Sequence, residues 1–211
     1  MKAARDYPLG VECAWPIPAK ATKSDRIWLA VVCVLLVVGA WQAGRGMWIQ
    51  AKAALAQVLL AQAWSRTLAG ESKAKPWPWA DTWPVAKLTV PRLGIECYVL
   101  EGADGSALAF GPGHAGGTAL PGSNGNSVIG GHRDTHLAFL KNVKPGDDLL
   151  VERPDGVRVS YRAASAEIVD RRDVWVMEQA GPARLTLITC YPFDALRAGG
   201  PQRYVLLAFL S

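Results

Sequence analysis

The segment RLTLITC, residues 184–190, indicates the fold of this protein more clearly than any other stretch. It is rich in β-branched and apolar residues, which favours a β-strand. Tyr191-Pro192 follows at once, and because proline cannot donate a hydrogen bond to a neighbouring strand, it ends this one. We therefore expect Cys190 to lie at the rim of a sheet, where a substrate can reach its thiol.

Six further segments have a similar β-like character, and turn sequences such as Pro154-Asp155-Gly156 separate them. They cover residues 87–92, 95–101, 126–130, 148–153, 157–163 and 203–210. Seven or eight short strands with little helix between them are typical of an all-β barrel or sandwich, and not of an α/β sheet.

An apolar run near the N-terminus predicts a transmembrane helix over residues 27–44. Its eighteen residues before Arg45 are close to the minimum for a helix that crosses a bilayer. Trp28 and Trp41 near its ends resemble the aromatic belts of membrane interfaces. A buried helix of a soluble protein would normally carry a polar stripe, and this run has none.

Basic residues are concentrated before this run, where five occur: Lys2, Arg5, Lys20, Lys23 and Arg26. Only Arg45 and Lys52 lie nearby on the other side. The positive-inside rule then predicts a single-pass inner-membrane protein with a cytoplasmic N-terminus and a periplasmic or extracytoplasmic C-terminal domain. The alternative is a cleaved signal peptide, because Val38-Gly39-Ala40 fits a small-residue cleavage site.

The net charge of +5 is confined to the N-terminal part of the chain. Residues 1–84 carry ten Lys and Arg against five Asp and Glu, whereas residues 85–211 carry thirteen of each. A neutral C-terminal domain lacks the clustered basic face that binding to phosphates requires, so a nucleic acid is not expected as a partner.

Residues 47–69 are rich in Ala, Leu and Gln and predict a second helix that stops at Gly70. This helix either continues the membrane helix as a stalk or lies on the membrane surface. In the Pro- and Trp-rich linker that follows, we expect Trp77, Trp79 and Trp83 to pack on the next domain, because exposed indoles are costly. The expected organisation is a cytoplasmic tail, a transmembrane helix, a helical stalk, a linker and a catalytic domain, over residues 1–26, 27–44, 45–70, 71–84 and 85–211.

The sequence contains four cysteines, Cys13, Cys33, Cys97 and Cys190. They form no CxxC pair and have no zinc-finger spacing, so neither a disulfide framework nor a structural zinc site is indicated. Only Cys97 and Cys190 belong to the predicted β-domain. We interpret Cys97 as a strand residue that is independent of Cys190, and a disulfide between the two is the alternative.

Two residues are expected to join Cys190 at the rim. His132 follows residues 126–131, whose terminal glycines let the backbone turn and approach other groups closely. Arg203 opens the last strand thirteen residues after the cysteine, and a loop of that length returns the chain to the same edge. A lone cysteine is usually a small buried hydrophobe, whereas a thiol with an imidazole and a fixed cation indicates nucleophilic catalysis.

These residues lie in motifs that resemble the sortase family: TLITC at residues 186–190, GHRD at residues 131–134, and Arg203 at the start of the final strand. The resemblance covers residues 85–211 and implies a closed β-barrel. The stretch GPGHAGGTALPGSNGNSVIGGHRDTH is similar to class D and related sortases. The Trp-rich linker and single N-terminal anchor resemble the Gram-negative, marine proteobacterial branch.

The resemblance also implies a reaction without a metal or organic cofactor. Cys190 would attack the Thr–Gly carbonyl of an LPxTG-like sorting signal in a protein substrate and form a thioacyl enzyme, which an amine acceptor or water releases. His132 would transfer protons, and Arg203 would bind the substrate backbone or the oxyanion. Thr189 matches the family's threonine before the nucleophile and is expected to support the site.

Other candidate residues do not occupy the motif positions. We interpret His114 and His136 as loop or support residues and rank Arg197 below Arg203. The GPGHAG sequence fits a dinucleotide-binding pattern, but its proline and the lack of a following helix argue against that site. His132 and His136 have the spacing of a helical metal site, although glycines precede them. The alternative functions are a thiol- or zinc-dependent peptide hydrolase and an inactive membrane-tethered binding domain.

Overall fold

The computed structural model describes residues 22–179, 181–195, 197 and 199–211. Most of the predicted cytoplasmic tail, with Cys13 and three of its basic residues, lies outside this part of the chain. The chain divides into two compact units, residues 1–49 and 50–211.

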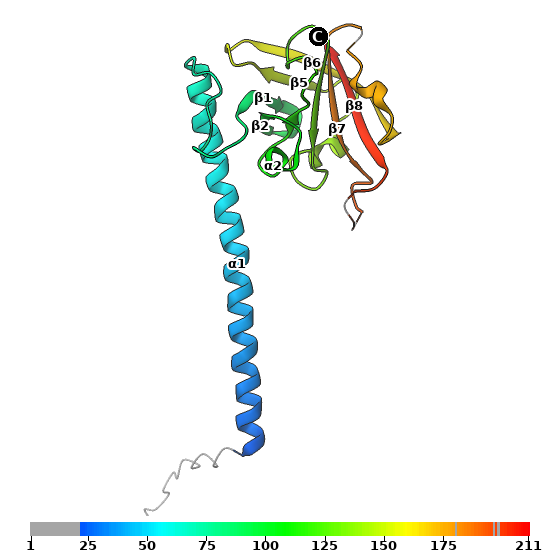
Figure 1. Ribbon diagram of the computed structural model, residues 1–211. Coiled ribbons are helices and arrows are strands. Elements are labelled where there is room, and N and C mark those ends of the chain that lie inside the picture. Colours follow the sequence, from blue (N-terminus) through cyan, green and yellow to red (C-terminus); the bar gives the residue numbers. More distant parts are fainter. Residues whose placement is uncertain (1–21, 180, 196, 198) are drawn as a thin grey trace, which may run out of the picture. The chain divides into compact units, whose positions relative to one another are not determined.

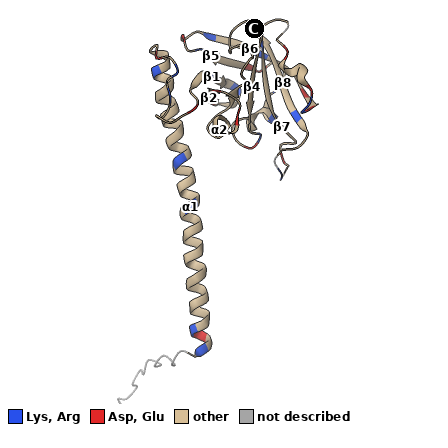
Figure 2. Ribbon diagram, viewed as in Figure 1, with Lys and Arg blue, Asp and Glu red and all other residues tan. Residues whose placement is uncertain are grey.

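Helix α1 (Lys23–Leu68) supplies the described part of the first unit. The Thr22 hydroxyl accepts a hydrogen bond from the Asp25 N–H, and the Asp25 carboxylate accepts one from the Thr22 N–H, which caps the start of the helix. A window of 18 residues has a mean hydropathy of 2.2 and no buried residue. Figure 2 shows charged residues at the start of the helix and an uncharged stretch after them. This apolar helix is compatible with a membrane anchor.

Residues 50–68 of α1 belong to the second unit and pack against its strands. Leu60 is fully buried and contacts Leu100 of the barrel. The Gln57 side-chain amide donates to the carbonyl oxygen of Phe110 at 2.9 Å, and the Trp64 indole N–H lies 3.3 Å from the Glu152 carboxylate. This part of the helix is therefore integrated into the second unit.

In the linker after α1, two of the three tryptophans pack on the domain as predicted, and one does not. The ring of Trp77 contacts Phe110 edge-on with centroids 4.8 Å apart, and Trp83 packs against the barrel core, as predicted. Trp79, however, is 80% exposed, so the prediction that it is packed on the domain is wrong. The Ala80 N–H donates to the Trp77 carbonyl at 3.0 Å, and the resulting turn places Trp79 on its outside.

Eight strands close into a barrel in the order β1-β2-β3-β4-β7-β8-β6-β5, which confirms the predicted closed β-barrel of seven or eight strands (Figure 1). The strands are β1 (Pro84–Val90), β2 (Ile95–Glu101), β3 (Gly113–His114), β4 (Asn126–Gly131), β5 (Asp148–Glu152), β6 (Arg158–Asp170), β7 (Arg184–Tyr191) and β8 (Gln202–Leu210). Short helices occupy four connections: η1 (Pro91–Leu93), α2 (Gly105–Leu108), η2 (Ala138–Asn142) and η3 (Val174–Met177).

Two strands differ from the sequence pattern. β3 has only two residues and lies in a glycine- and proline-rich stretch, where no strand signal is visible. β6 continues to Asp170, well beyond residue 163, because β8 pairs with it from Tyr161 to Asp170. Long-range pairing of this kind extends a strand past the point where local composition favours it.

The side chains of β7 and β8 alternate between two apolar clusters. Leu185 and Leu187 of β7 face the central core of the barrel together with Leu206 of β8. Ile188 and Val205 belong to a second cluster, which lies under η3 on the opposite face of the strands. This alternation decides which side chains at the ends of the two strands share a face.

Candidate active site

β7 and β8 are neighbouring strands (Figure 1), and their antiparallel register places Cys190 directly opposite Arg203. Side chains opposite each other in such a pair lie on the same face, with their Cβ atoms about 5 Å apart. The face is the one that Ile188 and Val205 share, two residues earlier on β7 and two residues later on β8. Cys190 is half-buried there, at the end of its strand.

His132 follows the end of β4, which runs parallel to β7. In the register of the two strands Gly130 pairs with Ile188, and Gly131 pairs with Thr189. One further step along both strands brings His132 level with Cys190. Because side chains alternate, His132 continues the face of Gly130, and it is exposed. The three predicted residues therefore lie at one edge of the barrel: His132 directly after β4, Cys190 near the end of β7 and Arg203 near the start of β8.

Thr189 connects the chain segments that carry the thiol and the imidazole. Its side chain is buried, and its hydroxyl donates to the carbonyl oxygen of Gly131 at 2.7 Å. The bond joins the residue before Cys190 to the residue before His132. A hydroxyl on β7 thus supplements the backbone ladder at the point where β4 ends.

The turn after β4 depends on a glycine. A Cβ atom on Gly131 would lie 2.7 Å from Cγ of Leu137, which is closer than atoms can pack. The Leu137 N–H donates to the carbonyl oxygen of His132 at 3.0 Å, so the chain folds back immediately after the histidine. Gly131 allows Leu137 to enter the core beside the end of the strand.

The loop between β7 and β8 is held by two arginines. Nη1 of Arg203 donates to the carbonyl oxygens of Gly200 and Gln202 at 2.7 and 2.9 Å. Nη2 of Arg133 donates to the carbonyl oxygens of Ala195 and Arg197 at 2.8 and 2.6 Å. In the sequence, Arg133 is part of the GHRD motif but is not predicted as a site residue. Its place directly after His132 is the signal that could have identified it.

The remaining sequence candidate in this loop, Arg197, uses its backbone and not its side chain in these contacts, and the residue is exposed. Aromatic rings support the loop from the core side. Phe193 contacts Tyr191 and Tyr204 edge-on, with ring centroids 6.2 and 5.2 Å apart. The loop is therefore anchored at both of its ends.

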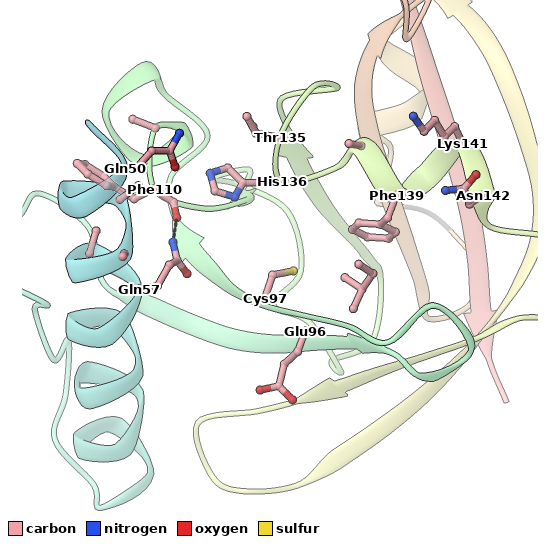
Figure 3. Close-up of a pocket in the computed structure, with 16 residues that line it drawn as sticks. Gln50, Gln57, Glu96, Cys97, Phe110, Thr135, His136, Phe139, Lys141 and Asn142 are labelled. Atoms are coloured by element: carbon pink, nitrogen blue, oxygen red, sulfur yellow. Dashed lines mark hydrogen bonds between the residues drawn. The ribbon is translucent and has the colours of Figure 1, made fainter. Parts of the chain in front are cut away.

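Cys97 and His136 line a separate cleft of about 740 Å³, shown in Figure 3. Burial, followed by the nearby charge of Glu96, raises the pKa of Cys97 to about 12. Burial also lowers the pKa of His136, which favours its neutral form. Cys97 and Cys190 are both free thiols, so the alternative of a disulfide between them is not realised in this structure.

His114 is buried in β3 and takes part in a local network. Its Nε2 lies 2.9 Å from the carbonyl oxygen of Ala119 and 3.0 Å from the Thr118 hydroxyl, and its Nδ1 lies 3.7 Å from the Glu101 carboxylate. Among the residues that the structure describes, no group of three or more His, Cys, Asp or Glu side chains is arranged to hold a metal ion.

Comparison with known proteins places this barrel in a family. The model of the sortase domain matches residues 88–211, and the chain belongs to the sortase family, whose members are cysteine transpeptidases. Sortase D of Bacillus subtilis (strain 168) is 32% identical over 120 residues, which are 56% of this chain and 60% of that protein. The chain thus matches less than two thirds of the length of this curated relative.

Solved sortases share the fold. The catalytic domain of B. anthracis SrtD is 34% identical with a TM-score of 0.52, and the match covers 61% of this chain and 87% of that one. Sortase A from Corynebacterium diphtheriae is 26% identical with a TM-score of 0.56, and the match covers 63% of each chain. These similarities agree with the closed barrel and with the resemblance seen in the motifs.

Proposed function

We propose that this chain is a membrane-anchored transpeptidase that cleaves an LPxTG-like sorting signal between Thr and Gly. In this proposal Cys190 is the nucleophile, His132 the general acid and base, and Arg203 the group that stabilises the oxyanion. The acyl group of the substrate passes through a thioester on Cys190 to an amine or to water.

One observation carries this proposal, the shared register of β4, β7 and β8. Cys190 lies opposite Arg203 across an antiparallel pair, and the parallel pair that ends at Gly131 and Thr189 leads to His132 beside Cys190. A nucleophile, a proton-transfer group and a hydrogen-bond donor on one face of one edge are the parts that acyl transfer requires.

The chemistry follows from these positions. The Cys190 thiolate attacks the carbonyl carbon of the Thr–Gly bond, and the negative charge moves to the carbonyl oxygen, where the Arg203 guanidinium stabilises it. The tetrahedral intermediate collapses, the C–N bond breaks, and His132 protonates the departing glycine nitrogen. An incoming amine then loses its proton to His132, attacks the thioester and releases the Cys190 thiolate.

The surface beside Cys190 suits the apolar residues of such a signal. Ile188 lies on the same face as Cys190, is partly exposed and packs in one cluster with Trp175, whereas Val205 of this cluster is fully buried. Val174, which precedes Trp175 in η3, is 75% exposed. Leu and Pro side chains of a sorting signal would find apolar partners here, next to the nucleophile.

The apolar window of α1 supports an anchor, and we propose that the N-terminus is cytoplasmic and the barrel periplasmic or extracytoplasmic. The excess of basic residues before the window supports this orientation. Labelling of intact cells with a membrane-impermeant probe tests it, with a reporter cysteine in place of the exposed residue Asn124. Labelling without lysis supports the orientation, and labelling only after lysis contradicts it.

The activity is tested with the full chain in detergent, a set of LPxTG-like peptides and a primary amine. Mass spectrometry should detect a thioester on Cys190 and a product in which the amine has replaced the C-terminal glycine segment. Product without amine would indicate hydrolysis through the same intermediate. Cleavage of every peptide by Cys190→Ala would contradict the proposed nucleophile.

A further inference from the structure

We propose that Arg133 is a positioning residue of this site: its guanidinium holds the loop between β7 and β8 against the segment of His132, and this contact keeps the imidazole beside the thiol. The inference rests on the proposed function and extends it to a residue that does not itself touch the reacting atoms.

The contacts of Arg133 bridge two distant parts of the sequence. Its side chain is only 8% exposed, and one nitrogen, Nη2, donates to two loop carbonyls, those of Ala195 and Arg197. These residues follow it by 62 and 64 positions. A single side chain therefore determines how far the loop after Cys190 lies from the turn after His132.

The burial of this cation is not explained by charge pairing. No Asp or Glu within the described residues forms an ion pair with Arg133, and its Nη1 is buried without a hydrogen-bond partner among those residues. Burying a guanidinium without a carboxylate is unfavourable, and an apolar side chain of similar volume would fill the space at lower cost. The two N–H groups of Nη2, which reach two carbonyl oxygens, are what an apolar residue cannot supply.

The position of the contact connects it to catalysis. The loop begins after Tyr191, one residue beyond Cys190, and ends before Gln202, one residue ahead of Arg203. Arg203 itself donates to the Gly200 carbonyl of this loop. Displacement of the loop would therefore move the thiol, the guanidinium and the imidazole relative to one another.

A matched control exists elsewhere on the barrel. Arg92 also joins distant segments, since it donates to the carbonyl oxygen of Asn142 and to the Asp147 carboxylate. It lies at η1, and its contacts involve neither the end of β4 nor the loop between β7 and β8. Arg92→Met should lower thermal stability without changing the chemical step.

The experiment uses the full chain in detergent, an LPxTG-like peptide and a primary amine. Arg133→Met should lower kcat about 10- to 100-fold with a smaller change in KM and should shift the pH–rate profile, because the imidazole and thiol are no longer held together. Arg133→Lys should be intermediate, since an ammonium makes fewer contacts in a fixed geometry. Hydrogen exchange should accelerate at both the Leu137 and the Ala195 amides in Arg133→Met.

The outcomes separate this inference from the proposed function. If Cys190→Ala is inactive while Arg133→Met keeps the wild-type kcat and pH profile, the positioning role is overturned and the proposed function stands. If Cys190→Ala retains activity, the proposed function fails. If hydrogen exchange at the Leu137 and Ala195 amides is unchanged in Arg133→Met, the proposed role of the Arg133 side chain in holding the loop is overturned. Should Arg133→Met not fold, a wild-type profile for Arg133→Lys overturns the proposal.

Discussion

The second unit contains two cysteine–histidine pairs, and their surroundings differ. Cys190 and His132 end neighbouring strands at one edge of the barrel, on the face that also carries Arg203. Cys97 and His136 line a cleft between β2, η2 and residues 50–57 of α1. Both pairs have the residue types of a thiol catalyst, so composition does not distinguish them.

Packing and neighbouring charges distinguish the two cysteines, although both are partly exposed. Cys97 packs against the barrel core, where burial raises its pKa to about 12 and keeps the thiol protonated. It also has Glu96 as a neighbour, and a negative charge opposes thiolate formation further. Cys190, in contrast, has a residue with a guanidinium, Arg203, directly opposite it on β8. The presence of a cysteine beside a histidine is therefore not enough to indicate catalysis, because the surroundings of the thiol decide whether it can react.

The largest effect is expected from removing each thiol in turn. Cys190→Ala should lower transpeptidation by at least about 10⁴-fold, because the covalent intermediate can no longer form. Cys97→Ala should stay within about threefold of the unmodified protein. Initial rates with an LPxTG-like peptide and an amine measure both, and equal losses in the two variants would remove the distinction between the pairs.

Alkylation should be much slower at Cys97 than at Cys190. With a pKa of about 12, roughly 10⁻⁴ of Cys97 is thiolate at pH 8, far less than for an ordinary exposed thiol. Iodoacetamide at pH 8 should therefore modify Cys190 long before Cys97, as peptide mapping by mass spectrometry will show. Faster labelling of Cys97 in the folded protein would reverse the interpretation of its burial.

Replacement of the two histidines should differ by about 10²- to 10⁴-fold in kcat. His132→Gln removes the proposed proton-transfer group, whose contribution is typically of this size. His136→Gln should retain nearly full activity, because its half-buried ring faces the other cleft. Comparable losses of kcat in folded His132→Gln and His136→Gln proteins would contradict the assignment of proton transfer to His132 alone.

A smaller effect is expected at two buried threonines of β7. Thr189→Val removes the hydroxyl that bonds to Gly131, and we expect a loss of about 1 kcal/mol of stability and a several-fold decrease in kcat. Thr186→Val removes a bond to Asn126 and should cost similar stability with little change in kcat. Thermal unfolding and steady-state kinetics provide the test. Equal effects of the two substitutions on kcat would show that the hydrogen bond to Gly131 has no specific role in catalysis.

The smallest effect concerns pH and His136. Its pKa is lowered in the folded state, so the unfolded chain binds more protons as the pH falls below the ordinary value of about 6.5. The protein should therefore lose stability as the pH falls through this range toward the folded pKa, and His136→Gln should lose less. Melting temperatures between pH 7.5 and 5 compare the two, and identical slopes would contradict the role of His136 burial.

Part of the fold was accessible from local patterns. The β-branched run before Cys190 and the short strands between turns predicted an all-β barrel or sandwich, and the resemblance to sortases implied the closed barrel that the structure confirms. These signals are local because alternation and turn chemistry depend on near neighbours. The length of β6 and the presence of β3 depend on their partners, and neither was visible in the sequence.

By itself the sequence determined the family, the barrel class, the apolar N-terminal helix and the residue types that acyl transfer needs. Only the tertiary structure decided that β4 and β7 run side by side, that Cys190 faces Arg203, and that Arg133 bridges the two loops. The physical reason is distance along the chain. Packing sets the register of the strands, and it also sets the contacts of a buried guanidinium with carbonyls more than 60 residues away, and no local pattern encodes either.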